Sequence, residues 1–305
     1  MLLEDLKVIL KVAEFRSITA AATQLNMRTA TASAAVKRVE ASLGAELFVR
    51  TTRSLRLSTA GERYLPQCEE ALQMLEKAKL NIREDQGVIK GEVRIALSSD
   101  LGRNVITPWL DEFVCEYPEV SLRCLISDSN IDFYRDSIDM ALRYGSPSDS
   151  NIYGFKICDV PKVLCASKAY LAEHGTPSKP HDLLEHNALI YQLHDVLHDQ
   201  WQFDYGEKSV KVKVKGNRAS DDGDLVRRWC VSGKGLAVKS CLDMADDLLT
   251  GRVMSVMPNY KPASTELWLI CPSRQTVTPT VRLLRDMLRE KTEDILNKMK
   301  SRRIL

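Results

Sequence analysis

Residues 17–43 read SITAAATQLNMRTATASAAVKRVEASL, and they decide the fold because they predict two short helices joined by a tight turn. In the first helix the apolar residues are spaced three and four positions apart, which places them on one face. They are Ile18, Ala21, Ala22 and Leu25. Ser17 precedes this helix and is a favourable N-cap residue. Residues 26–28 are too few for anything but a turn.

The second predicted helix has two different faces. Thr29, Ser33 and Lys37 lie four residues apart on a polar face that carries no acidic residue. The opposite face is apolar and consists of Ala32, Val36, Val39 and Leu43. Hydroxyl and ammonium groups suit the major groove of DNA, whose base edges offer both donors and acceptors. The stretch therefore favours a helix-turn-helix, and from these residues alone an ordinary pair of packed helices with a solvated face remains the alternative.

The neighbouring residues extend this prediction to a winged three-helix unit over residues 1–58. Residues 2–14 carry an apolar face that closes the core, made of Leu6, Ile9, Leu10 and Ala13. Residues 46–57 predict two short extended arms with Arg50, Arg53 and Arg56, which suit phosphate contacts. The net charge of the 305 residues is only +2. Any nucleic-acid footprint must therefore be local.

Residues 59–86 predict a long linker helix. Its apolar residues form a heptad-like seam, which consists of Leu65, Cys68, Leu72, Leu75 and Ile82. We expect this seam to have no partner within its own small domain, so that the same helix of a second subunit covers it and the protein is a dimer. Pro66 lies inside the helix and predicts a bend.

Gly87 and Gly91 bracket a hinge at residues 87–91, and residues 92–305 then alternate between strand and helix patterns. This alternation predicts an α/β sheet with mainly parallel pairing. We expect a two-subdomain clamshell, with subdomain I at about 92–161 and 266–305 and subdomain II at about 162–265. Ligands in such folds bind beyond the carboxyl ends of strands, and two helix-opening segments, 98–100 and 220–222, fit that position or serve as helix caps only.

The composition excludes several other classes of protein. The eight cysteines form no C-x-x-C pair, which argues against a zinc site or a disulfide framework. His194 and His198 have a metal-binding spacing, but a solvated loop is the favoured interpretation, so we expect neither a metal nor a cofactor. No signal peptide or membrane-spanning run is evident, which predicts a cytoplasmic protein without a membrane partner. No hydrolase or nucleotide-binding motif is present, so no enzyme activity is expected.

Taken in this order, the elements resemble the LysR-type transcriptional regulators over essentially the full chain. The similarity is specific in residues 15–22 (FRSITAAA), 47–53 (LFVRTTR) and 57–61 (LSTAG). In the second region it is carried by 139–145 (DMALRYG), 165–171 (CASKAYL) and 232–237 (SGKGLA). The fold class implied is α + α/β: a winged helix-turn-helix, a long linker helix and a clamshell resembling type 2 periplasmic binding proteins.

The resemblance implies a regulator that binds double-stranded promoter DNA as a dimer, and further as a tetramer formed by two dimers, with a small-molecule effector in the cleft. By position, base-edge contacts come from Arg28, Thr29, Ser33 and Lys37, and backbone contacts from Arg50, Thr51 and Arg53. Effector contacts involve Ser98, Ser99, Asp100, Asp128, Ser167, Ser220 and Asp221.

The chain departs from the family pattern at three places. Arg16 stands where glycine is usual, which affects the turn before the second helix. Ala34 and Ala35 replace a basic residue and a glutamine, which predicts weaker direct readout of bases and more reliance on DNA shape. Asp100 and Asp221 disfavour a simple anionic effector unless Arg103, Arg218 or Lys239 compensates, so the effector is polar and neutral, or absent.

Two rival functions come from other classes. A solute-binding protein without a DNA role explains the clamshell but leaves the first 90 residues without a purpose. An enzyme acting in the cleft requires a nucleophile and base, for which the sequence offers no pair.

Overall fold

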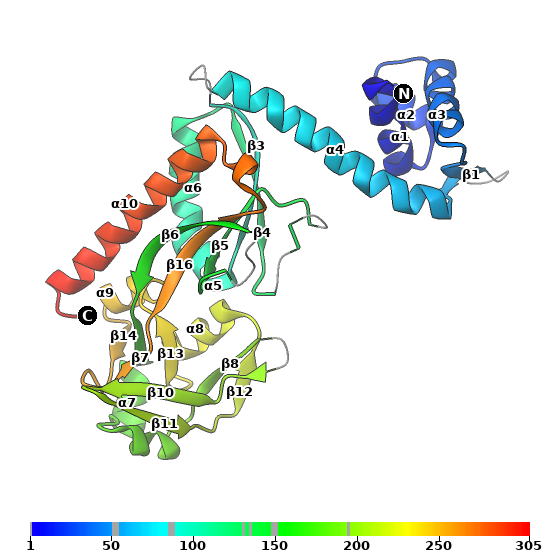
Figure 1. The fold of residues 1–305 in the computed structure, drawn as a ribbon. Helices are drawn as coiled ribbons and strands as arrows, with labels where there is room; N and C mark the ends of the chain where they lie inside the picture. Colours follow the sequence, from blue (N-terminus) through cyan, green and yellow to red (C-terminus); the bar gives the residue numbers. More distant parts are fainter. Residues whose placement is uncertain are drawn as a thin grey trace. The chain divides into compact units, whose positions relative to one another are not determined.

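The computed structural model describes residues 2–50, 55–84, 89–129, 132–133, 136–147, 152–193 and 196–305. The chain forms two compact units, Met1–Arg83 and Glu84–Leu305. Figure 1 shows the order of their helices and strands along the chain. The first unit contains α1 (Leu3–Phe15), α2 (Ile18–Gln24), α3 (Thr29–Leu43), β1 (Phe48–Arg50), β2 (Leu55–Leu57) and α4 (Thr59–Glu84).

The core of the first unit confirms the predicted helix-turn-helix. Ala21 and Ala22 of α2 and Ala32, Val36 and Val39 of α3 are buried together. Their small side chains let the helices approach closely. The Ser17 hydroxyl accepts a hydrogen bond from the Ala20 N–H at 3.2 Å and so caps α2, as predicted. The predicted stripe was wrong at its last member, because Leu43 is exposed.

An ion pair between the buried Asp5 and the exposed Arg38 joins α1 to α3. Asp5 is only 4% exposed, and its carboxylate accepts hydrogen bonds from Nε of Arg38 at 3.0 Å and from Nη2 of the same residue. The hydrogen bond to Arg38 lowers the pKa of Asp5. Arg38, although basic and next to the polar stripe, is therefore committed to holding the helices together.

The wing is an antiparallel pair of strands in which Phe48 faces Leu57 and Arg50 faces Leu55. The Glu40 side chain of α3 anchors its first strand by accepting hydrogen bonds from the N–H groups of Leu47 and Phe48, at 2.9 and 3.3 Å. Thr51 and Arg53 lie outside the described residues, and of Arg50 only the backbone is described.

The seam of α4 was assigned wrongly in its first half. Leu65, Cys68 and Leu72 are buried in the core of their own unit, because α4 begins beside the three helices and the wing. Only the later part faces outward: Leu75 is 44% exposed and Met74 71% exposed. The side chain of Ile82 is outside the described part.

The first lobe of the second unit is a five-stranded sheet with helices. Its strand order is β4-β3-β5-β16-β6. The elements are β3 (Gly91–Leu97), α5 (Ser99–Leu101), the π-helical turn η1 (Gly102–Ile106), α6 (Thr107–Glu116), β4 (Val120–Ile126), β5 (Met140–Tyr144), β6 (Tyr153–Val160), β16 (Thr265–Cys271), the 3-10 turn η3 (Arg274–Thr276) and α10 (Pro279–Ser301).

The second lobe contains three small sheets, ordered β12-β8-β9, β13-β7-β14 and β11-β10-β15. Its strands are β7 (Lys162–Ser167), β8 (Leu189–Leu193), β9 (Val196–Leu197), β10 (Gln200–Tyr205), β11 (Lys208–Lys213), β12 (Arg218–Ser220), β13 (Ala237–Ser240), β14 (Val253–Ser255) and β15 (Lys261–Pro262). Its helices are α7 (Lys168–His174), the 3-10 turn η2 (Pro180–Glu185), α8 (Gly223–Val231) and α9 (Ala245–Leu249).

The expectation of mainly parallel pairing was wrong. β3 pairs in parallel with β4 and β5, and β8 with β12. The strands near the two crossings between the lobes are antiparallel: β16 against β5 and β6, and β7 against β13 and β14. Because the chain leaves the first lobe after β6 and re-enters it through β16, these strands run against the strands of the α/β repeats.

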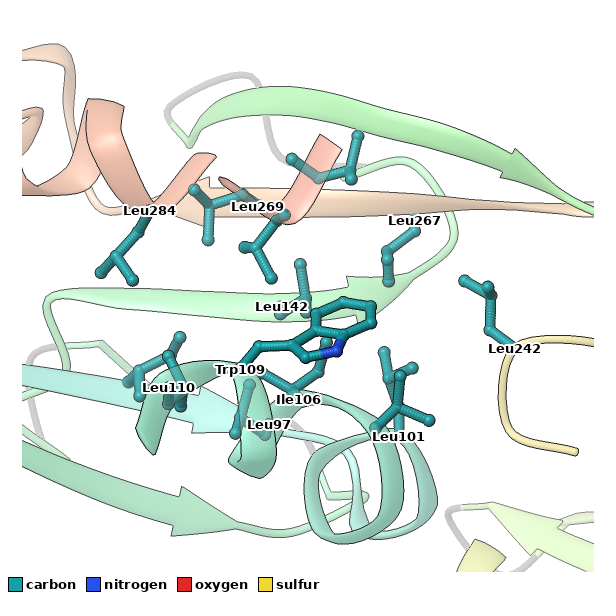
Figure 2. Packing of buried hydrophobic residues seen from close by; sticks show 14 of the residues in the cluster. Leu97, Leu101, Ile106, Trp109, Leu110, Leu142, Leu242, Leu267, Leu269 and Leu284 are labelled. Atoms are coloured by element: carbon teal, nitrogen blue, oxygen red, sulfur yellow. The ribbon is translucent and has the colours of Figure 1, made fainter. Parts of the chain in front are cut away.

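The first lobe has a main apolar core, and a smaller cluster of Ala96, Phe133, Ile138 and Ala141 is separate from it. Alternate residues of the sheet strands, among them Leu97, Leu142 and Leu269, are buried against α6 and α10. Figure 2 shows Trp109 of α6 at the centre of this cluster, with Leu284 of α10 at its edge. In the described part of the chain, no helix combines the length and apolar character needed to cross a membrane.

Candidate DNA-binding surface and effector cleft

The outer face of α3 presents the polar stripe. Thr29 and Lys37 are exposed and Ser33 is half-buried. Arg28 is exposed at the N-cap position, where its extended backbone starts the helix without a side-chain cap bond. Within the described part of this unit, neither Arg28 nor Lys37 has an acidic partner. Arg28 and Lys37 are therefore available to an anionic partner. Arg38 differs, because it is paired with Asp5.

The two alanines that depart from the family pattern differ in burial. Ala35 is buried in the core and Ala34 is half-buried, so neither extends the polar stripe. The long polar side chains that the family pattern places at these two positions are therefore absent from this helix. Weaker direct readout of bases stays a prediction.

A cavity of about 480 Å³ lies between the lobes of the second unit. Ser98, Asp100 and Asp128 line it from the first lobe, and Tyr191, Trp201 and Lys239 from the second. A neighbouring cavity of about 410 Å³ shares Asp128 and is lined also by Ser99 and Asp221. Volumes of this size are typical of sites for small molecules.

Two of the residues proposed as effector contacts have other local roles. Ser167 is buried and caps α7 by accepting a hydrogen bond from the Tyr170 N–H at 3.2 Å. Ser220 ends β12 and accepts from the Asp222 N–H at 3.1 Å. Neither lines one of the two cavities, so their assignment as effector contacts rests on the family resemblance alone.

Helix starts from both lobes converge on one carboxylate. Asp128, in the loop after β4, accepts a hydrogen bond from the Ser99 N–H at 2.7 Å and another from the Ser99 hydroxyl. It also accepts from the N–H of Gly223, the first residue of α8 in the second lobe, at 2.9 Å. The Asp224 N–H donates to the Ser99 hydroxyl at 3.3 Å.

The helix that starts at Ser99 is held close to the sheet at Gly102. A Cβ at this position would lie 2.8 Å from the Cβ of Leu97 and 3.0 Å from Cδ1 of Ile126. Such distances require a residue without a side chain. The π-helical turn begins here, as is common near functional sites.

Lys239 is the charged centre of the cleft. Its ammonium lies against an oxygen of Asp100, donates to the Gly223 carbonyl at 3.0 Å and is 3.6 Å from Asp243. Burial raises the pKa of Asp100 to about 7, against the opposing effect of the Lys239 charge. Burial alone would lower the pKa of Lys239, but Asp100 and Asp243 raise it above its usual value. Lys239 therefore stays charged and compensates Asp100, as the sequence allowed.

Further cavity residues were not found from the sequence. Arg143, the residue before the last of β5, donates a hydrogen bond to the Ser127 carbonyl, and its Nη2 is buried without a hydrogen-bond partner among the described residues. The buried hydroxyl of Ser98, which was a predicted effector contact, is likewise unpartnered among the described residues. Tyr144 donates to Asp243 at 2.6 Å, and burial lowers the pKa of Lys162. The position of Arg143 at the carboxyl end of a strand beside β3 was a usable signal.

The formal charges around the larger cavity balance. Arg143, Lys162 and Lys239 face Asp100, Asp128 and Asp243. Among the residues that the structure describes, no group of histidine, cysteine, aspartate and glutamate is arranged to hold a metal ion. His194 is outside these residues, so the predicted absence of a metal there stays a prediction.

Comparison with known proteins gives consistent matches. A family described as "Bacterial regulatory helix-turn-helix protein, lysR family" matches residues 3–62, and "LysR substrate binding domain" matches residues 86–293. The HTH-type transcriptional regulator DmlR of Escherichia coli (strain K12) is 30% identical over 290 residues, 95% of this chain and 94% of that protein. The HTH-type transcriptional activator TtdR of the same strain is 27% identical over 269 residues, covering 88% and 86%.

Solved structures of LysR-type regulators match nearly the whole chain. CrgA, a LysR-type transcriptional regulator from Neisseria meningitidis, matches with a TM-score of 0.61 at 26% identity, covering 94% of this chain and 98% of that chain. The full-length Vibrio cholerae virulence activator AphB matches in fold with a TM-score of 0.57 at 23% identity, covering 95% and 99%.

Proposed function

Because the chain belongs to the LysR family of transcriptional regulators, with a helix-turn-helix DNA-binding domain and an effector-binding domain, we propose that it binds promoter DNA through the outer face of α3. The observation that carries this proposal is the exposed stripe of Arg28, Thr29 and Lys37, whose cations have no acidic partner among the described residues. An acid-free basic stripe on a recognition helix suits the major groove.

In this proposal the contacts divide by chemistry. Arg28, Thr29, Ser33 and Lys37 contact base edges in the major groove, and the wing residues Arg50, Thr51 and Arg53 contact the phosphate backbone. Phosphate contacts supply affinity and base contacts supply discrimination. With Ala34 and Ala35 on the helix, DNA shape carries part of the specificity.

The effector of this proposal is a small polar molecule without net charge. The balanced formal charge of the residues that line the larger cavity supports this class, and the unpartnered Nη2 of Arg143 and hydroxyl of Ser98 offer it hydrogen bonds. Ser98, Asp100 and Asp128 are its contacts from the first lobe. We also propose contacts from Ser99 and Asp221 at the neighbouring cavity, and we expect the cleft to bind its ligand without turnover.

The quaternary arrangement belongs to the same proposal. The 44% exposure of Leu75 and the 71% exposure of Met74 support a dimer formed through residues 59–86. Two dimers then pair into a tetramer on an interrupted palindrome. Residues 1–58 act as the DNA-binding domain, 87–91 as the hinge and 92–305 as the sensor. Because its relatives regulate transcription, we expect the protein to act in the cytoplasm.

A fluorescence-anisotropy titration tests the DNA contacts. The full chain is titrated against duplex DNA from upstream of its own gene and against a scrambled duplex, at two salt concentrations. We expect Lys37→Ala to weaken binding to the specific duplex by roughly 10- to 100-fold and to narrow its advantage over the scrambled duplex.

Lys11→Ala is the matched control, since it removes the same charge from α1, where Lys11 pairs with Glu14 at 2.5 Å. Its affinity should equal that of the wild type. Equal losses in the two variants would mean that general charge, and not the α3 stripe, determines binding.

A further inference from the structure

The carboxylate of Asp128 accepts hydrogen bonds from a set of donors in the cleft that could otherwise bind an anion. Three donors surround it: the Ser99 N–H, the Ser99 hydroxyl and the Gly223 N–H. The Ser99 groups belong to the first lobe and Gly223 to the second. Backbone N–H groups at helix starts, combined with a hydroxyl, are the set by which proteins hold the carboxylate of a bound molecule. Here the chain supplies that carboxylate itself.

The charges around this carboxylate explain why the subsite holds a side chain of the protein and not a free anion. Asp222 and Asp224 lie beside the same helix start. Nη1 of Arg103 lies 3.0 Å from a carboxylate oxygen of Asp222 and 3.8 Å from one of Asp224, so it partly neutralises both. A free anion would meet these negative charges and would also lose its translational freedom. A side chain fixed in the loop after β4 loses much less freedom on binding, so it fills the position where a mobile anion is disfavoured.

We propose that Asp128 is an internal ligand: it holds the two lobes together in the absence of an effector and excludes small carboxylates from the subsite formed by Ser99 and Gly223. The natural effector therefore presents no carboxylate to this subsite. This statement about the effector rests on the proposed function, whereas the internal contact rests on the cleft geometry alone.

Removing the contact should loosen the cleft without dismantling it. Other bonds between the lobes remain, including Lys239 to Asp100 and the Asn104 amide donating to Asp224 at 2.8 Å. Asp128→Ala leaves a space of about the size of a formate ion and leaves the three donors free. Formate is therefore the probe for the vacated position.

The experiment is hydrogen exchange of the full chain, resolved at the amides of Ser99, Gly223 and Asp224. In Asp128→Ala we expect these amides to exchange on the order of 10-fold faster than in the wild type. Sodium formate at 100 mM should restore most of the protection in this variant, and sodium chloride at the same concentration should not. The wild type should respond to neither salt.

Glu207→Ala is the matched control, because it removes an exposed carboxylate from the turn between β10 and β11, in the second lobe, and lines neither cavity. It should exchange like the wild type and ignore formate. If Asp128→Ala does not fold, Asp128→Asn has the same size and retains one acceptor oxygen, and it should give a smaller increase at Gly223 and Asp224.

Unchanged exchange in Asp128→Ala, or equal protection of wild type and variant by formate, would overturn the internal ligand. Neither result depends on DNA. If the titration shows no specific DNA binding but the amides exchange as predicted, only the proposed function is overturned.

Discussion

Arg16 adopts the left-handed backbone conformation between α1 and α2, with φ 49° and ψ 31°. An L residue is disfavoured there because its Cβ crowds the backbone, which explains why glycine is usual at this position. The turn forms nevertheless, since Ser17 caps α2 and the helices bury their shared core.

We expect Arg16→Gly to stabilise the first unit by up to about 1 kcal/mol, the relief of this strain being partly offset by the greater freedom of the unfolded chain. Hydrogen exchange of the α1 to α3 amides in the full chain measures the effect. Asn26→Gly is the control, because Asn26 is also left-handed with φ 52° but asparagine tolerates this region. A loss of stability at Arg16→Gly would contradict the strain.

The pair of Asp5 and Arg38 makes the stability of the first unit depend on pH. Because the pKa of Asp5 is lower in the folded chain, its contribution is present above the unfolded value near 4 and is lost as the pH falls through the folded value. The difference in unfolding free energy between wild type and Arg38→Met should therefore be full at pH 7 and fade below about pH 4.

Denaturation at a series of pH values measures this difference. Arg63→Met removes an exposed arginine of α4 and should show no such pH dependence. A difference for Arg38→Met that stays constant down to pH 2 would mean that Arg38 acts through packing and not through the Asp5 charge.

At the scale of elements, Glu40 joins the recognition helix to the wing. Its Oε1 accepts hydrogen bonds from the N–H groups of both Leu47 and Phe48. We expect Glu40→Ala to destabilise the first unit by about 1–3 kcal/mol, because two backbone donors lose a charged acceptor. Exchange of the Leu47 and Phe48 amides should rise first. The exposed Glu46 gives the control Glu46→Ala, and similar effects of the two changes would refute the anchoring role.

Elements with strong periodicity were predictable from the sequence. The apolar pattern of the sequence predicts a strand at 120–126 and a helix at 280–300; the structure has β4 at Val120–Ile126 and α10 at Pro279–Ser301. β6 was missed because Gly154 and Asp159 interrupt its pattern. The sequence analysis does not predict β10, although its buried Trp201 and Phe203 alternate with the exposed Gln200, Gln202 and Asp204 in the pattern of a strand. The sequence pattern also predicts a short helix near residues 131–135, most of which lie outside the described residues.

The cleft was predictable only in part. Ser98, Ser99 and Asp100 follow a strand and open a helix, which is a local signal. The contact between Asp128 and Gly223 joins residues 95 positions apart. No periodicity encodes which loop carboxylate meets which helix start, because that depends on the docking of the two lobes.

At the scale of the whole molecule, the outward face of α4 predicts self-association. We expect Leu75→Glu to raise the dissociation constant of the dimer by at least about 10-fold, because it places a charge in an apolar helix seam. Sedimentation equilibrium measures this. Gln67→Glu adds the same charge at another exposed position of α4 and should leave the dimer intact. A dimer that survives Leu75→Glu would place the interface elsewhere.

The measurement that tests the regulator most directly is hydrogen exchange of the full chain with and without the duplex from upstream of its gene. The expected result is protection of residues 28–37, at the start of α3, with α1 unchanged. Protection confined to α1, or none anywhere in the first unit at saturating duplex, would contradict DNA recognition by the α3 stripe.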